Sequence, residues 1–388
     1  MAASCQLRTL LSRAVSRFRC SGGPRYTSTA SLIVAEAVDH SACWVTVEDH
    51  KATRRNIPEE PGRRDGRRLL WAAVAFSLFS SKEEDKRDEA QRKEDEMILL
   101  LKKAKLSIHR GQLPAASSFL HQAVVLAHQT HNNQAIIYTY SQMANVAYVQ
   151  GQLDGAEKLF KAAMSYMLAG GTPQDDNAII EMSLKLATIY AEQNKAELAE
   201  HGFMFCTESL ETKLETQKGL PEEDQTEEQE ELRKETRLLL GLCLDSRARY
   251  RASTLHLSQA ELDYRTALAI CHQEQGETHP QTLVLMSDLA TILDLQGRHD
   301  EALVLVQQAV DLSRSVGHPD YHVLLGNLAG ILLHTGQLEN AVRFYNEALE
   351  LAWQAGDQEA VNRVQEGLKE VQKRRSQEKK AEPEGAAE

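Results

Sequence analysis

The chain has 388 residues, of which 42% are apolar, 26% charged and only 5% aromatic, and its net charge is −12. Residues 1–81 hold 12 Lys/Arg and 7 Asp/Glu, which leaves 32 basic and 49 acidic residues, a net charge of −17, for the rest. An acidic body of this kind repels phosphate backbones, so we expect no nucleic-acid partner. The six cysteines never form a Cys-x-x-Cys pair, which argues against a disulfide framework or a zinc site and indicates reduced thiols.

Residues 1–35 contain no acidic residue, while arginines recur among apolar residues and serines. The arginines are Arg8, Arg13, Arg17, Arg19 and Arg25. This composition is typical of a mitochondrial transit peptide, whereas a secretory signal needs an apolar run that these arginines interrupt. We therefore interpret residues 1–68 as a transit peptide with an irregular N-terminal region; the alternative is a disordered basic tail.

Residues 69–81 form a short apolar segment behind Arg63, Arg64, Arg67 and Arg68. As a helix, 13 residues reach about 20 Å, less than the roughly 30 Å of a bilayer core. Three interpretations remain open: a stop-transfer or shallow membrane anchor, part of a longer bipartite presequence, and a buried first helix. Residues 82–96 are expected to be a charged linker.

A repeated pattern of small and large apolar residues dominates residues 97–372. A small residue is followed by another small residue twelve positions on, a large apolar residue four further on, and a small residue three beyond that. The six sets are Ala104/Ala116/Leu120/Ala123, Ala144/Ala156/Phe160/Ala163, Ala187/Ala199/Phe203/Cys206, Ala248/Ala260/Tyr264/Ala267, Ala290/Ala302/Val306/Ala309 and Ala329/Ala341/Tyr345/Ala348. The spacing predicts pairs of closely packed antiparallel helices.

This pattern resembles that of the tetratricopeptide repeat family, which implies an all-α, right-handed superhelical array of about six helix pairs. The first small residues lie 40, 43, 61, 42 and 39 positions apart, longer than the 34-residue period of the family. His279-Pro280 and His318-Pro319 are similar to linker residues in the long repeats of kinesin light chains. We expect an amphipathic helix after Leu351 to cap the array, and a disordered tail at 373–388.

The 61-residue interval contains an acidic insertion at residues 208–237, with 11 acidic and 5 basic residues. Its ends could extend the flanking helices, with Gly219-Leu220-Pro221 breaking them. Two interpretations of this insertion are open: a solvated loop or helical hairpin, and a docking element for a basic partner.

The chain shows no catalytic motif. "GRHDEA" at 297–302 groups four polar residues, but its sister stretches at 111, 151 and 336 do not repeat them, so we interpret it as a turn and a helix entrance. His121 and His128 share a helix face without a nearby carboxylate or cysteine, so no metal site is expected there. We predict a non-enzymatic protein with no cofactor, no metal and no small-molecule substrate.

A repeat array offers instead a concave surface lined by the first helix of each pair. The repeat spacing places eight polar residues on that surface as a candidate partner-binding groove. They are Lys105, Asn145, Tyr148, Lys185, Arg249, Asp288, Asp294 and Asn327. Some tetratricopeptide domains use Lys and Asn there to hold a carboxylate, and Lys105 and Asn145 partly match that arrangement; ordinary surface polarity is the alternative.

Several longer stretches carry a more specific resemblance: "YTYSQMANVAYVQGQLDGAEKLFKAAMSY", "QDDNAIIEMSLKLATIYAEQN" and "HPQTLVLMSDLATILDLQGRHDEA". Behind the Arg-rich start, they resemble a family of mitochondrial tetratricopeptide repeat proteins. The resemblance implies a matrix-facing factor at the inner membrane that supports assembly and maintenance of respiratory complex III, the cytochrome bc1 complex. The implied partners are complex III subunits including the Rieske iron-sulfur protein, whose fragments the family helps to clear. The alternative is a cytosolic cargo adaptor of the kinesin-light-chain type.

Overall fold

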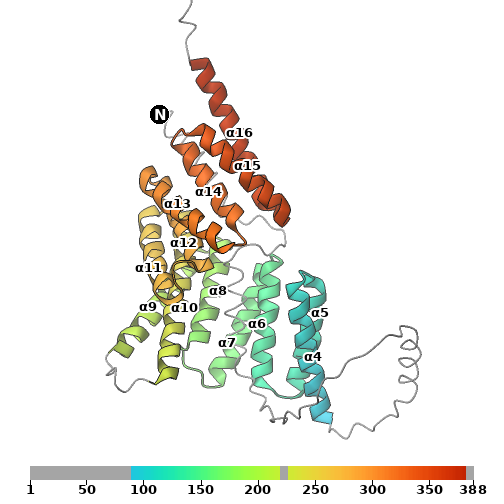
Figure 1. Ribbon diagram of the computed structural model, residues 1–388. Coiled ribbons are helices and arrows are strands. Elements are labelled where there is room, and N and C mark those ends of the chain that lie inside the picture. The colour runs from blue at the N-terminus through green and yellow to red at the C-terminus, as the bar shows by residue number, and fades with distance from the viewer. Residues whose placement is uncertain (1–88, 219–225, 382–388) are drawn as a thin grey trace, which may run out of the picture.

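A computed structural model describes residues 89–218 and 226–381, where the chain forms thirteen helices and no strand. The pairs are α4 (Glu89–His109) with α5 (Leu113–Gln129), α6 (Asn133–Val149) with α7 (Leu153–Ala169), α8 (Asn177–Glu192) with α9 (Ala196–Lys218), α10 (Glu227–Ser253) with α11 (Leu257–Gln275), α12 (Pro280–Leu295) with α13 (His299–Val316) and α14 (Tyr321–His334) with α15 (Leu338–Ala355). The last helix, α16 (Gln358–Ala381), packs against α14 and α15. Figure 1 shows the pairs following one another in chain order. The predicted all-α array of six helix pairs with a C-terminal helix is confirmed.

The small and large apolar positions of the repeat pattern form the core. All members of the six sets are buried, and the most exposed of them, Tyr345, is only 4% exposed. The helices of a pair approach closely there: a Cβ built on Gly202 of α9 would lie 2.7 Å from the Cβ of Ala187 on α8. The core therefore admits no larger residue at the crossing points.

The turn between the two helices of a pair requires one residue in the left-handed region. Glycine takes this place in four pairs, at Gly111, Gly151, Gly297 and Gly336, with φ between 69° and 81°. Asn194 and Leu255 occupy it in the other two, with φ of 58° and 67°. Gly297 directly precedes Arg298, the N-cap of α13, so the interpretation of "GRHDEA" as a turn and helix entrance is confirmed.

The His-Pro pairs lie in linkers, as expected. His279 is the N-cap of α12, where its Nδ1 accepts a hydrogen bond from the amide of Gln281, and Pro280 begins the helix. His318 lies before α14, and its Nδ1 accepts from the amide of Asp320. Imidazoles therefore satisfy amide groups that a helix start leaves unpaired.

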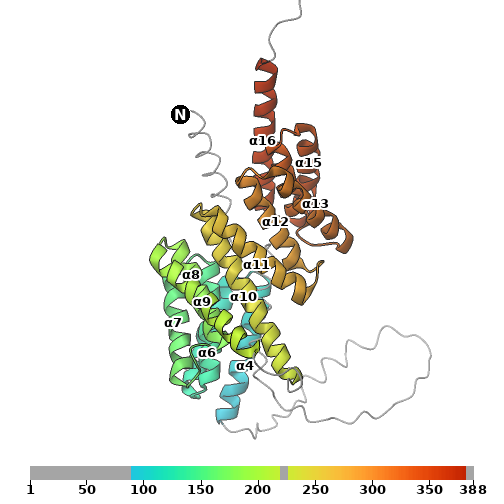
Figure 2. The same ribbon diagram turned by 90° about the vertical axis from the view of Figure 1, so that its left-hand side faces the viewer.

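The acidic insertion lengthens the helices on both sides of it. α9 runs to Lys218, and α10 begins at Glu227 with a capping box between Thr226 and Gln229. The first turns of α10 extend past the end of α11 (Figure 2). Residues 219–225, which include the expected helix break, lie outside the described residues.

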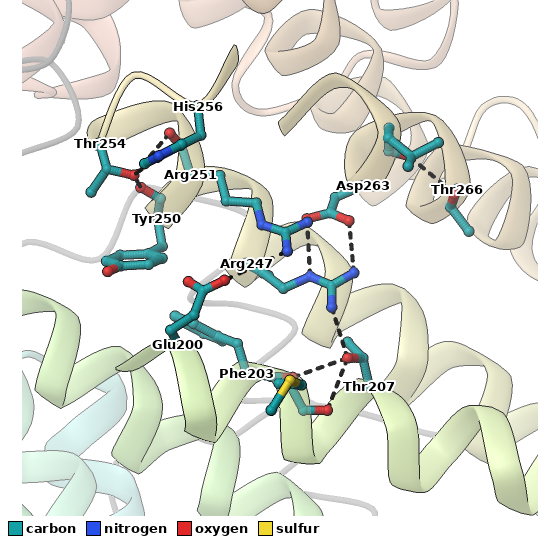
Figure 3. A network of polar contacts seen from close by, with 12 residues as sticks. Glu200, Phe203, Thr207, Arg247, Tyr250, Arg251, Thr254, His256, Asp263 and Thr266 are labelled. Atoms are coloured by element: carbon teal, nitrogen blue, oxygen red, sulfur yellow. Dashed lines mark hydrogen bonds and ion pairs between the residues drawn. The ribbon is translucent and has the colours of Figure 1, made fainter. Parts of the chain in front are cut away.

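A buried ion cluster joins α9, α10 and α11 at this point of the array (Figure 3). Arg247 binds both carboxylate oxygens of Asp263, at 3.0 and 2.8 Å, and Arg251 binds the same carboxylate at 2.7 Å. Arg247 also donates to Thr207 on α9 at 2.8 Å. A bidentate pair of this kind fixes orientation, so the cluster sets how the third pair meets the fourth.

Two expected boundaries are corrected. α4 begins at Glu89, inside the expected charged linker 82–96, because its charged residues form helical pairs such as Glu89–Lys93 at 2.9 Å. α16 continues to Ala381, inside the tail expected at 373–388. Arg374 holds that stretch by donating to the carbonyl oxygen of Leu333 at 2.7 Å. The expected transit peptide and the apolar segment 69–81 lie outside the described residues.

Replacing Ala302 by Trp should destabilise the array, because Ala302 is fully buried at a helix crossing. Overpacking of this kind costs about 1–3 kcal/mol or more. Urea unfolding followed by circular dichroism measures the loss. Val304→Trp is the matched control, since Val304 lies two residues on and is 72% exposed. Equal stability of the two variants would contradict the packing argument.

Replacing Leu255 by Gly should stabilise the array. A left-handed conformation costs a non-glycine residue about 1–2 kcal/mol, and the greater freedom of glycine in the unfolded chain offsets part of that gain. The free energy of unfolding should therefore rise by about 0.5–1 kcal/mol. The reverse change, Gly297→Leu, should lower it, and a loss of stability in Leu255→Gly would show that the side chain contributes more than the strain removes.

Candidate functional site

The eight candidate groove residues lie on the first helices of the pairs, α4, α6, α8, α10, α12 and α14. Seven of them contact a side chain of a neighbouring first helix, and those contacts form a polar seam in two stretches, between α6 and α8 and from α10 through α12 to α14. The eighth, Lys105, is exposed on α4. We call this surface the first-helix face.

The seam begins between α6 and α8. Lys185 donates to the Oδ1 of Asn145 at 3.3 Å, pairs with Glu181 at 3.2 Å, and lies over the ring of Phe160. The structure thus brings Lys185 and Asn145 together. It also neutralises Lys185 within its own helix, which reduces its capacity to hold a partner's carboxylate.

Tyr148 continues the seam by donating a hydrogen bond to Glu192 of α8. Burial raises the pKa of Glu192, and the bond from Tyr148 opposes that rise.

The centre of the seam is a charged cluster between α10 and α12. Arg249 donates to the Oδ2 of Asp245 at 2.5 Å, and its Nε lies 4.0 Å from the Oδ2 of Asp288. Gln281 donates to the same Asp245 oxygen at 3.3 Å. Burial raises the pKa of Asp245, and it raises that of Asp288 to about 7, because desolvation outweighs the attraction of Arg249.

The seam ends between α12 and α14. Asp294 is buried, and its two carboxylate oxygens accept from the Nδ1 of His299 at 2.7 Å and of His334 at 2.5 Å. Asn327 donates to the hydroxyl of Ser287 at 2.8 Å. His299 therefore has a specific partner that the repeat comparison did not indicate.

Sequence reasoning missed half of this seam. Asp245 lies four residues before Arg249, and Glu181 lies four residues before Lys185. This spacing favours ion pairs on a helix and is the signal by which the sequence could have identified both carboxylates. Glu192 and His334 share one position of the repeat, five residues after the small residue of the first helix. Gln281 carries no such signal, because its contact joins residues 36 positions apart.

The structure also describes the surroundings of the other candidate histidines and of the cysteines. His128 binds the hydroxyl of Tyr140 at 3.0 Å and His121 the carbonyl oxygen of Ser117 at 2.7 Å, so the two imidazoles are engaged separately. Within residues 89–218 and 226–381, no three His, Cys, Asp or Glu side chains are placed to hold a metal ion. No helix of this part combines the length and apolar character that crossing a membrane requires. Its three cysteines, Cys206, Cys243 and Cys271, are free and buried.

Comparison with known proteins identifies both the fold and the family. Tetratricopeptide repeat profiles match residues 257–315 and 323–352. The apo form of RapI shares the fold, with a TM-score of 0.53 at 10% identity over 92% of this chain and 80% of that chain. A Rap protein complexed with competence and sporulation factor has a TM-score of 0.50 at 12% identity, over 78% of each chain.

Relatives among curated proteins are much more similar. Tetratricopeptide repeat protein 19, mitochondrial, of Danio rerio is 68% identical over 308 residues, which cover 79% of this chain and 75% of that protein. The Rattus norvegicus protein of the same name is 48% identical over 80% of each chain. The Homo sapiens protein is 50% identical over 66% of this chain and 70% of its own length. Because the match spans most of both chains, this protein belongs to the family of mitochondrial tetratricopeptide repeat protein 19.

Proposed function

We propose that the protein is a non-enzymatic binding scaffold that supports assembly and maintenance of respiratory complex III at the matrix side of the mitochondrial inner membrane. The partners are complex III subunits, above all the Rieske iron-sulfur protein, whose fragments the scaffold helps to clear. The observation that carries this proposal is the 68% identity to a protein named mitochondrial tetratricopeptide repeat protein 19 over most of the chain. The mitochondrial names of the relatives favour it over a cytosolic cargo adaptor.

We place the partner contact on the first-helix face. Polar side chains there are half-buried and paired in a row, which presents a preformed set of donors and acceptors along several repeats. Preformed groups lose little conformational entropy when a partner binds. Import through residues 1–68 and membrane association through residues 69–81 complete the proposal.

Replacing Lys105 by Glu should weaken the capture of complex III subunits. Lys105 is exposed on α4, at the end of the first-helix face, where a charge reversal alters the surface that a partner meets. We expect about a tenfold loss of affinity, which corresponds to about 1.4 kcal/mol. Affinity purification from mitochondria, with quantification of the Rieske protein and other complex III subunits, measures it.

Lys158→Glu is the matched control, because Lys158 is equally exposed on the second helix α7. It should leave capture unchanged. Capture of no complex III subunit by the unaltered protein would overturn the proposal itself, and equal losses in both variants would move the contact away from the first-helix face.

Replacing Asp288 by Asn should stabilise the protein at pH 8. Burial raises the folded-state pKa of Asp288 from 3.8 to about 7, in surroundings that include Asp245, Arg249 and, from α16, Arg363. The stability that this raised pKa provides is complete at low pH and is lost as the pH rises through about 7. Asn does not ionise, so thermal unfolding should show a higher Tm for the variant at pH 8 and a smaller difference at pH 6.

Asp300→Asn, an exposed change on α13, should show no such pH dependence. A lower Tm of Asp288→Asn at pH 8 would mean that the Asp288 carboxylate is well compensated.

A further inference from the structure

The cluster between α10 and α12 contains more carboxylates than guanidinium groups. We define the α10–α12 cluster as Asp245 and Arg249 of α10, Tyr264 of α11, and Gln281 and Asp288 of α12. It holds two carboxylates and one guanidinium. The Arg249 and Gln281 donors converge on the same atom, the Oδ2 of Asp245, at 2.5 and 3.3 Å. The other carboxylate oxygens of the cluster receive neither bond.

Buried acceptors of the cluster lack a donor. The Oδ1 of Asp245 and the Oε1 of Gln281 are buried without a hydrogen-bond partner in the described part of the chain. The amide nitrogen of Gln281 faces Asp245, so its carbonyl oxygen remains as an acceptor. Each unpaired buried polar group costs about 1–3 kcal/mol. The cluster therefore has more hydrogen-bond acceptors than donors.

The side chain of Asp288 is the carboxylate of the cluster that a partner can reach. Its side chain is 24% exposed, and the closest cation, the Nε of Arg249, lies 4.0 Å away, beyond hydrogen-bond distance. Arg249 is itself 34% exposed. Burial raises the pKa of Asp288 to about 7, which shows that the charges around it leave the carboxylate undercompensated.

The described residues place no second cation within ion-pair distance of Asp288. Arg363 of α16 is the other basic side chain that acts on Asp288, and it pairs at 3.6 Å with Glu359 of its own helix. An incoming anion would meet two carboxylates against one guanidinium and would be repelled. An incoming cation would restore the balance.

We propose that the α10–α12 cluster is a receptor for one basic side chain, lysine or arginine, of the protein segment that binds the first-helix face. Its N–H groups bind the Asp288 carboxylate, while Arg249 remains on Asp245. The inference rests on the proposed scaffold function and adds the chemistry of the partner. The partner segment carries a basic residue where it crosses from α10 to α12.

Selection of phage-displayed 12-residue peptides on the purified full-length protein tests this inference. Peptides selected on the unaltered protein should share a Lys or Arg at one aligned position. Selection on Asp288→Asn should lose that preference, and selection on the control Asp300→Asn should keep it. A synthetic peptide from the first selection should bind about tenfold more weakly when its Lys or Arg becomes Gln, and that change should have no effect on binding to Asp288→Asn.

The outcomes separate the inference from the function on which it rests. Selected peptides without a basic preference, or with the same preference on Asp288→Asn, overturn the inference and leave the scaffold function standing. Failure of the unaltered protein to select any peptide counts against both. Circular dichroism of Asp288→Asn at the selection pH shows that the variant is folded, so a lost preference reports on recognition.

Discussion

The array depends on one steric constraint: each first helix must carry a small residue where its second helix crosses it. Ala104, Ala144, Ala187, Ala248, Ala290 and Ala329 fill this place, and none is more than 1% exposed. The positions twelve residues later, on the second helices, are also alanines, so only methyl groups lie between the two helices. Large residues four positions later fill the adjacent space. The stacking of pairs, and with it the alignment of the first helices, follows from this contact.

Alignment of the first helices produces the polar seam. Side chains on neighbouring first helices lie 40 residues apart in the chain but within hydrogen-bond distance in space, as Asn145–Lys185, Ser287–Asn327 and Asp294–His334 show. The seam thus follows from the repeat geometry.

Two charge clusters near the middle of the array differ in their numbers of carboxylates and guanidinium groups. Around Asp263, two guanidinium groups bind one carboxylate with short bonds, and Arg251 also lies 3.6 Å from Glu200, so guanidinium groups and carboxylates are equal in number, which suits a rigid junction between pairs. The buried Nε of Arg251 has no hydrogen-bond partner. Around Asp288, two carboxylates share one guanidinium, and buried acceptors are left without donors. An arrangement that costs stability on an otherwise consistent fold is typical of a binding site. This contrast is why we assign recognition to the second cluster and architecture to the first.

The sequence by itself determined the helix pairs, their core positions and their turns, because those features depend on local spacing: twelve, four and three residues, with a glycine between. It also indicated the candidate face, since that face follows from the same spacing. The boundaries expected from the sequence were wrong at the two ends, where charged residues continue α4 and α16 as helix. Nothing in the sequence indicated that Leu255 adopts a left-handed conformation without being glycine. Only the tertiary structure decided which polar side chains meet: Gln281 with Asp245, Arg249 with Asp288, and both His299 and His334 with Asp294. Such pairs depend on how neighbouring repeats are stacked, which no local period records.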